Sequence, residues 1–119
     1  MIKRWLPLLC LLSACAGSNK SKISPTTGVP DCILQKIDEF KRQPVQNPPR
    51  SVYSFIYSDS IVYYIPSICC DQFSDLYDGN CLLLGHPDGG FIGKGDGKVN
   101  DFSTTKTGEK IIWKDSRSK

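Results

Sequence analysis

The sequence predicts an α+β fold in which one N-terminal helix packs on a small antiparallel sheet of two hairpins, and disulfides staple the layers together. Three observations predict this fold. Helical periodicity is confined to one segment that begins near residue 31, strand-like segments then follow one another with no helical pattern between them, and six cysteines occur in 119 residues. Strands joined by short turns pair antiparallel, and a single helix covers one face of such a sheet.

The predicted helix lies in the segment PDCILQKIDEFKRQP. Ile33, Ile37 and Phe40 recur at the spacing that places side chains on one face of a helix, so they form its buried stripe. The side chain of Asp31 is expected to cap the N-terminus, and Pro44 ends the helix. The helix is interpreted as a packing element.

The first predicted hairpin joins the strands Val52–Tyr57 and Ile61–Ile65 through a turn at Ser58-Asp59. Because side chains alternate between the two faces of a strand, one face is aromatic and the other aliphatic. The aromatic residues are Tyr53, Phe55 and Tyr57. The helix is expected to pack against one of these faces. The other is either a second core that the C-terminal segment covers or an exposed aromatic surface that binds a partner.

The second predicted hairpin is built around Asp78-Gly79-Asn80, because Asp-Gly between two apolar segments is a strong signal for a tight turn. Its strands are Asp75–Tyr77 and Cys81–Leu84. A further short strand or docked segment is expected at Ile111–Trp113. A single domain therefore covers residues 31–115, and residues 116–119 form a tail.

The first thirty residues carry targeting information rather than fold. Residues 1–14 have the basic start, the short apolar stretch and the small-residue ending of a signal peptide, and the apolar stretch is too short to span a bilayer. Residues 15–30 are rich in Ser, Thr, Gly and Pro and lack apolar periodicity. This composition predicts a flexible tether.

The segment Leu12-Ser13-Ala14-Cys15 resembles a bacterial lipobox. The resemblance implies that Cys15 receives acyl chains, palmitate among them, and becomes the N-terminus of a membrane-anchored lipoprotein; two or three chains give a stable anchor. Ala16 rather than Asp follows the cysteine, which by the sorting rule of enteric lipoproteins implies the outer membrane. No acidic run follows, so the periplasmic side is favoured over the cell surface. The alternative is an ordinary secreted protein with a chance cysteine.

The charge of the chain argues against nucleic acid as a partner. The sequence contains 15 basic and 12 acidic residues, and loss of the signal peptide with Lys3 and Arg4 leaves 13 of the 15 basic residues against the same 12 acidic ones. Nucleic-acid binding needs a clustered basic face, which a nearly neutral exported domain does not offer. The sequence contains no cofactor motif, and no cofactor is expected.

Four cysteines lie within the predicted domain: Cys32, Cys69, Cys70 and Cys81. In an oxidising envelope an even number of cysteines predicts disulfides. A bond between the neighbours Cys69 and Cys70 would close a strained ring, so we expect Cys32 to pair with one of them and Cys81 with the other. Zinc is the alternative, but the adjacent pair lacks the two-residue gap of a zinc knuckle, and the sequence has no second pair.

The stretch LLLGHPDGGFIGKGDGK, residues 82–98, allows three interpretations. A phosphate-binding loop would need glycine at position 88, Ser or Thr at position 95 and a helix afterwards, and the sequence meets none of these needs. A calcium-binding loop would use the carboxylates of Asp88, Asp96 and Asp101, but their spacing departs from the EF-hand pattern. The third interpretation, a compact series of glycine-rich turns, is the one that the composition favours.

His86 is the only histidine and the candidate for a hydrolytic site, with Asp88 or Asp75 as its partner. A Cys–His pair needs a free thiol, whereas the cysteines are expected to be bonded. A Ser–His–Asp triad has no G-x-S-x-G motif to support it. The sequence therefore favours a protein that is not an enzyme, with the calcium-dependent module and the small hydrolase as alternatives.

Several motifs together resemble one family. They are VYYIPSICCDQFSDLYD, HPDGGFIGKGDGK, Asp101-Phe102 and EKIIWKDSR, and the resemblance that they carry extends over about residues 31–115. The chain resembles small bacterial lipoproteins, mainly of the Bacteroidota, that are catalogued as domain of unknown function 6970. The resemblance implies no activity and supplies no catalytic residues. The prediction is an anchored envelope lipoprotein that acts as a binding module, with the membrane as one partner through Cys15 and an envelope protein or glycan as the other.

Overall fold

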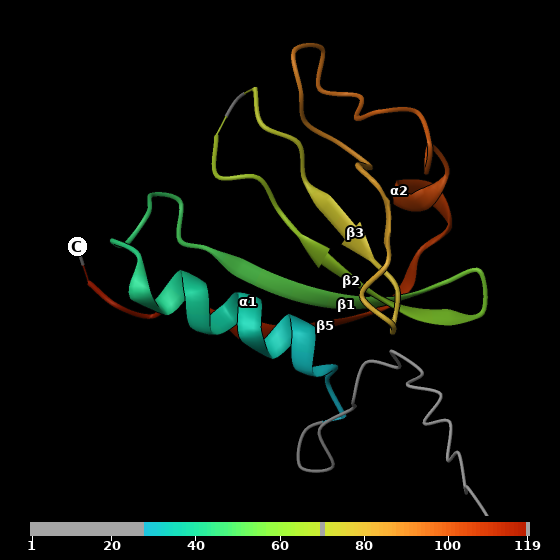
Figure 1. Ribbon diagram of the computed structural model, residues 1–119. Helices are drawn as coiled ribbons and strands as arrows, with labels where there is room; N and C mark the ends of the chain where they lie inside the picture. Colours follow the sequence, from blue (N-terminus) through green and yellow to red (C-terminus); the bar gives the residue numbers. More distant parts are fainter. Residues whose placement is uncertain (1–27, 70, 119) are drawn as a thin grey trace, which may run out of the picture.

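The computed structural model describes residues 28–69 and 71–118. It confirms the predicted fold class, because a long helix packs on a five-stranded antiparallel sheet (Figure 1). The predicted signal peptide, Cys15 and most of the predicted tether lie outside the described residues, as does Cys70. In the described part of the chain, no helix has both the length and the apolar character that a membrane span requires.

Helix α1 spans Asp31–Arg42. Ile33 and Ile37 are buried as predicted, and Phe40 packs beside them. The N-cap residue is Pro30 and no side chain caps the helix, so the predicted cap at Asp31 is wrong. Asp31 lies instead in the first turn, where its carboxylate is next to the positive end of the helix dipole.

The folded domain begins slightly earlier than predicted. Val29 and Pro30 fall within the predicted tether, yet both are buried, and Val29 belongs to the core beneath α1. The carbonyl oxygen of Pro30 accepts hydrogen bonds from the backbone amides of Ile33 and Leu34. These contacts fix the direction in which the chain enters the helix.

The sheet contains β1 (Ser51–Tyr57), β2 (Ser60–Ile65), β3 (Asp75–Tyr77), β4 (Leu83–Gly85) and β5 (Thr107–Lys114). Their order is β4-β3-β2-β1-β5, and all neighbours pair antiparallel. The first hairpin turns at Ser58 and Asp59, which both have positive φ as a type I′ turn requires. The last strand is longer than the predicted Ile111–Trp113, because it continues along the edge of β1.

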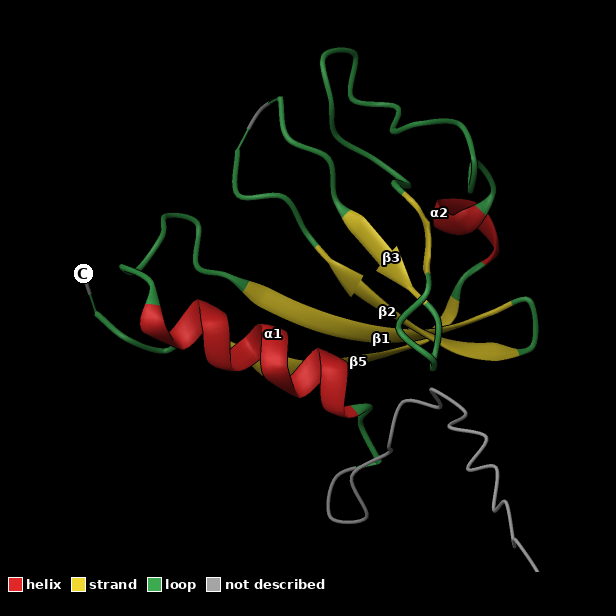
Figure 2. Cartoon of the chain, in the orientation of Figure 1, coloured by secondary structure: helices red, strands yellow, loops and turns green. Residues whose placement is uncertain are grey.

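Each face of the sheet has its own core. The α1 face buries Val29, Ile33, Ile37, Val52, Tyr63 and Ile65, whereas the opposite face buries Phe55, Val62, Leu76, Val99 and Phe102. The aromatic face of the first hairpin is therefore covered. The cover is the short helix α2 (Phe102–Thr105), which the sequence did not predict, and not the C-terminal segment, which forms edge strand β5 (Figure 2).

A disulfide joins Cys32, in the first turn of α1, to Cys81, which follows the turn between β3 and β4. The predicted pairing of each of these residues with Cys69 or Cys70 is therefore wrong. The turn at Asp78-Gly79-Asn80 returns the chain to the start of α1, where the Cα atoms of the two cysteines lie 6.2 Å apart. Sequence spacing does not reveal this approach. Cys69 is also disulfide-bonded.

The predicted tail contributes a clasp to the fold. The guanidinium of Arg117 donates hydrogen bonds to the carbonyl oxygens of Phe40, Lys41 and Gln43, at 3.3, 2.9 and 3.0 Å, and to the carboxylate of Asp115. The last carbonyls of a helix have no partner within the helix, and a cation is favourable there. The clasp therefore holds the chain at Arg117 beside the end of α1 (Figure 1).

We expect Arg117→Gln to lower the melting temperature at neutral pH, by an amount that shrinks in acid. Hydrogen bonding from Arg117 is the main cause that lowers the pKa of Asp115 below its ordinary value. A carboxyl group whose pKa falls on folding stabilises the protein above its unfolded pKa of about 3.9, and that contribution is lost as the pH falls through the folded pKa. Melting temperatures of both proteins should therefore be compared from neutral pH into acid.

The matched control is Arg42→Gln, at the same end of α1. Arg42 is exposed and makes no ion pair within residues 28–69 and 71–118, so its effect should not change with pH. A difference between wild type and Arg117→Gln that stays constant below about pH 4 would contradict the role of Asp115.

Candidate functional site

Within the glycine stretch, residues 83–85 form β4, and residues 86–98 fold into a compact loop beyond it, drawn as the uppermost loop in Figure 2. Two backbone hydrogen bonds tie it to the segment before β3, from Ser74 N–H to the carbonyl of Asp88 and from Gly90 N–H to the carbonyl of Gln72. Two more close the loop on itself, from Gly95 N–H to Gly89 and from Asp96 N–H to His86. The stretch therefore has the geometry of a self-contained surface loop made of turns.

Gly95 lies where two parts of this loop touch. Its φ is +70°, and a Cβ atom there would stand 2.0 Å from the carbonyl oxygen of His86. We expect Gly95→Ala to lower the free energy of unfolding by at least about 2 kcal/mol, because both the backbone conformation and the space exclude a side chain. For a domain of this size that corresponds to a fall in melting temperature of about 10 °C.

Gly79→Ala is the control for that substitution. Gly79 lies in the turn between β3 and β4, its φ is not positive, and a Cβ there would meet no atom within 4 Å among the described residues. Thermal unfolding of the control should stay within about 0.5 kcal/mol of the wild type. Equal losses for the two variants would show that the loop does not need glycine at position 95.

Asp88 is the centre of a hydrogen-bond network that fastens the loop to the sheet. Its Oδ1 accepts a hydrogen bond from Ser74 Oγ at 2.5 Å, and its Oδ2 accepts one from the Tyr64 hydroxyl at 2.6 Å. Ser74 is 1% exposed, and its Oγ also accepts the backbone amide of Ser67 at 3.0 Å. Burial, assisted by the hydrogen bond to Asp88, raises the pKa of Tyr64 to about 12. Both carboxylate oxygens of Asp88 are thus engaged within the protein.

The other two predicted calcium ligands also accept hydrogen bonds from the protein. Desolvation raises the pKa of Asp96. Hydrogen bonds from the backbone amides of Lys98 and His86, both at 3.1 Å, have the opposite effect, and the pKa of Asp96 lies below its ordinary value. Asp101 accepts a hydrogen bond from the Tyr57 hydroxyl at 2.5 Å, which raises the pKa of Tyr57. In the described part of the chain, no three His, Cys, Asp or Glu side chains are placed to hold a metal ion.

His86 meets Asp75 and not Asp88. Its Nδ1 lies 3.0 Å from Asp75 Oδ1 and 2.9 Å from the carbonyl oxygen of Ser74, and the Phe73 ring stacks on it with centroids 4.8 Å apart. Both neighbours of Nδ1 are acceptors, which assigns the ring proton to Nδ1. Among the described residues no hydroxyl or thiol is hydrogen-bonded to the ring, and the nearby Ser74 hydroxyl donates to Asp88 instead. In this part of the chain the His86–Asp75 pair therefore has no nucleophile hydrogen-bonded to it.

The aromatic face that the sequence offered as a binding surface is largely core. Phe55 is 5% exposed, and its ring meets Phe102 edge to face with centroids 5.4 Å apart. Tyr57 meets the other side of Phe102 at the same distance, and Tyr53 packs against the same cluster. Only parts of Tyr53 and Tyr57 remain accessible. These rings stabilise the contact between sheet and α2.

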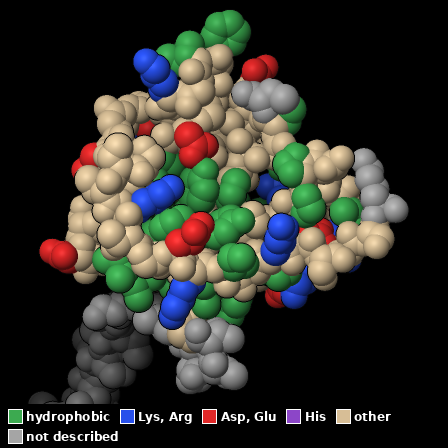
Figure 3. Space-filling view, turned by 180° about the vertical axis from the view of Figure 1, so that it is seen from behind, with side chains coloured by type: hydrophobic (Ala, Val, Ile, Leu, Met, Phe, Trp, Pro, Cys, Tyr) green, Lys and Arg blue, Asp and Glu red, His purple; other side chains and the backbone are tan. Residues whose placement is uncertain are grey.

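The structure reveals an apolar tip that sequence reasoning missed. A hydrogen bond from Gly93 N–H to the carbonyl of Gly90 closes a turn with Phe91 and Ile92 at its centre, and these side chains are 95% and 72% exposed. Apolar side chains cap the top of the molecule in Figure 3, where Figure 1 places the orange loop. The available signal was two large apolar residues between glycines, at turn positions that ordinarily hold small or polar residues.

A family model described as "Domain of unknown function (DUF6970)" matches residues 38–115, which include every strand and the C-terminal end of α1. No curated protein and no solved structure matches the chain.

Proposed function

Because the chain belongs to the family described as a domain of unknown function (DUF6970), whose description assigns no activity, we propose its function from its residues and geometry. It is a lipid-anchored lipoprotein of the bacterial cell envelope, placed in the outer membrane and facing the periplasm. It acts as a non-catalytic binding module. Its partner is an envelope protein, which it contacts through the apolar tip formed by Phe91 and Ile92.

The lipobox-like ending of the predicted signal peptide supports the anchor. If Cys15 is acylated, Cys15→Ala should abolish incorporation of labelled palmitate and release the protein from the membrane fraction after export. The control is Cys10→Ala, because Cys10 is not preceded by the small residues of a lipobox. This variant should still incorporate labelled palmitate. Labelling that persists in Cys15→Ala would overturn the anchor.

The hydrogen bonds that the acidic side chains make within the protein support a binding role rather than a catalytic one. Asp88, Asp96 and Asp101 each accept hydrogen bonds that hold the loop or α2 in place. The His86–Asp75 pair has no activated nucleophile beside it in the described part of the chain.

The single observation that carries the proposal is the exposure of Phe91 and Ile92 on a braced loop. Full burial of a large apolar side chain stabilises a complex by about 1.5–3 kcal/mol, so two of them can act as the anchor of a small interface. The Asp88 network and the loop's own backbone bonds hold the tip before any partner arrives. Preorganisation of this kind reduces the entropy lost on binding.

The position of the tip points to a partner on the side away from the anchor. The described chain begins, in blue, at the lower end of Figure 1, whereas the orange loop lies at the upper end. A tether that enters at one end presents the other end away from its membrane. The tip offers no hydrogen-bonding side chain, and sugar hydroxyls lose hydrogen bonds to water unless these are replaced. An apolar pocket on a protein therefore fits the tip better than a glycan.

A photo-crosslinking amino acid at position 91, in the anchored protein within its own envelope, tests this contact. We expect a discrete protein adduct that disappears when Ile92→Asp is added. The control is the same crosslinker at Ile111, which is 64% exposed on β5 and should give no such adduct. Adducts to lipid at position 91 would show that the tip enters a bilayer, and adducts insensitive to Ile92→Asp would show random collision; either would overturn the proposed partner.

A further inference from the structure

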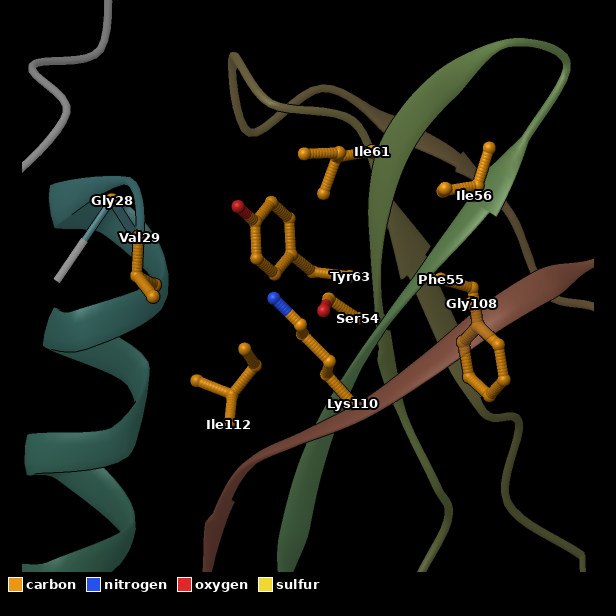
Figure 4. A pocket seen from close by; sticks show the side chains of 10 residues that line it. All are labelled: Gly28, Val29, Ser54, Phe55, Ile56, Ile61, Tyr63, Gly108, Lys110 and Ile112. Atoms are coloured by element: carbon orange, nitrogen blue, oxygen red, sulfur yellow. The ribbon is translucent and has the colours of Figure 1, made fainter.

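Helix α1 covers only part of its face of the sheet. Beyond the N-terminal end of the helix, the turn end of the β1–β2 hairpin and part of β5 line a groove of about 320 Å³ (Figure 4). We call it the hairpin groove. The lining residues that matter below are Ser54, Ile56, Ile61, Tyr63, Lys110 and Ile112.

The walls of the hairpin groove are apolar and open to solvent. Ile56 and Ile61 are directly paired across the hairpin, and they are 47% and 57% exposed although they stand on a core-forming face. The buried ring of Tyr63 lies between Ile61 and Ile112 around the hollow (Figure 4). On the face drawn in Figure 3, charged side chains lie among the apolar ones. Paired isoleucines left uncovered in a concave surface are typical of a ligand site.

Two polar groups converge on this apolar surface. Ser54 and Lys110 are register partners on β1 and β5, and in Figure 4 the amine of Lys110 and the hydroxyl of Ser54 both lie within the groove. Ser54 is 6% exposed. Within residues 28–69 and 71–118 neither side chain has a hydrogen-bond or ion-pair partner. A cation beside apolar walls, with a buried hydroxyl next to it, is complementary to an anion that carries an apolar group.

We propose that the hairpin groove binds a fatty carboxylate of medium chain length. The carboxylate accepts hydrogen bonds from Lys110 and Ser54, and the alkyl chain lies along Ile56, Ile61 and Ile112. The groove is at the small end of the range for ligand pockets, about 300–1,000 Å³, which suits one alkyl chain better than a folded partner. One cation matches one negative charge. The site is separate from the Phe91–Ile92 tip and does not depend on the proposed partner.

Titration of decanoate, below its micelle concentration, into isotopically labelled protein tests the proposal. The chain from residue 15 carries Cys15→Ser, so that no acyl chain of its own competes. We expect saturable shifts of the backbone amides of Ser54, Ile61 and Lys110. Lys110→Gln should weaken binding at least about tenfold, and Lys110→Arg should restore most of it. The control Lys114→Gln, on the same strand but outside the groove, should bind as the wild type does.

Four further probes test whether the groove selects a carboxylate with an alkyl chain. Decanol and decyltrimethylammonium, which share the chain but not the charge, should bind at least about tenfold more weakly than decanoate, and acetate should not bind measurably. Equal binding of decanol and decanoate, or an unchanged affinity in Lys110→Gln, would overturn the proposal. Tighter binding by a hexapeptide with a C-terminal isoleucine would assign the groove to a peptide terminus instead and would overturn it as well.

Discussion

Replacement of both Cys32 and Cys81 by alanine is expected to lower the free energy of unfolding by about 4 kcal/mol. The disulfide joins residues 49 positions apart, so it removes many conformations from the unfolded chain. It also fastens the first turn of α1 to the β3–β4 turn, two elements that the sheet does not otherwise join. The melting temperature should fall by about 20 °C.

Urea unfolding distinguishes the effect of the cross-link from a loss of packing. Without the cross-link the unfolded chain exposes more surface, so the dependence of unfolding free energy on urea should steepen as the stability falls. The double serine variant should behave as the double alanine variant does, because both lack the bond. A loss below about 1 kcal/mol with an unchanged slope would show that the bond contributes little.

Asp88→Ala should lower the free energy of unfolding by about 3 kcal/mol. It removes the acceptor for two hydroxyl donors, Tyr64 and Ser74, and leaves the buried Ser74 hydroxyl with the longer contact to the Tyr64 hydroxyl, at 3.3 Å. A hydrogen bond to a charged group contributes about 1.5–3 kcal/mol, so the loss of two such bonds supports a change of this size. The same loss should increase hydrogen exchange of the Gly90 and Gly95 amides, which depend on the loop.

Asp71→Ala is the matched control, because Asp71 is an exposed aspartate without a hydrogen-bond or ion-pair partner among the described residues. It should change the stability by less than about 0.5 kcal/mol. Tyr64→Phe removes one donor and keeps the ring, so its loss of unfolding free energy should lie between those of Asp71→Ala and Asp88→Ala. If Asp88→Ala destabilises only in the presence of calcium and not in chelator, Asp88 is a metal ligand and the network account fails.

Local patterns in the sequence predicted most of the elements. The helical spacing of Ile33 and Ile37, the aromatic and β-branched strands around Ser58-Asp59, and the Asp-Gly turn at residues 78–79 each describe interactions over a few residues. Such signals act within one turn or one hairpin, so the elements that they predict do not depend on distant parts of the chain. The α+β class followed from their order along the chain.

Features that depend on distant residues could not be predicted. The disulfide partner of Cys32 depends on where the β3–β4 turn points, and the length of β5 depends on the free edge of β1. Helix α2 is one turn long and carries too little periodicity to predict. Its Phe102 is nevertheless buried in the core on the face opposite α1. Each of these outcomes depends on residues tens of positions away.

In the candidate site, too, the local structure could be predicted and the contacts between distant residues could not. The composition of residues 82–98 favoured turns, and the structure has turns beyond residue 85, whereas Leu83–Gly85 forms β4. The individual partners could not be predicted: Asp88 binds Tyr64 and Ser74, while His86 binds Asp75. The exposed tip was visible in the sequence as Gly-Phe-Ile-Gly, but exposure is a tertiary property, and two apolar residues in sequence are equally compatible with burial.

The sheet is completed by β5, which the ribosome makes after the other four strands. Strand β5 pairs with β1, for example Trp113 with Val52, and Arg117 then fastens the end of the chain to α1. Because synthesis proceeds from the N-terminus, β1 has no partner at this edge until β5 has left the ribosome. Contacts between residues so far apart in sequence raise the contact order and delay folding. The sheet can therefore be completed only after β5 has been made.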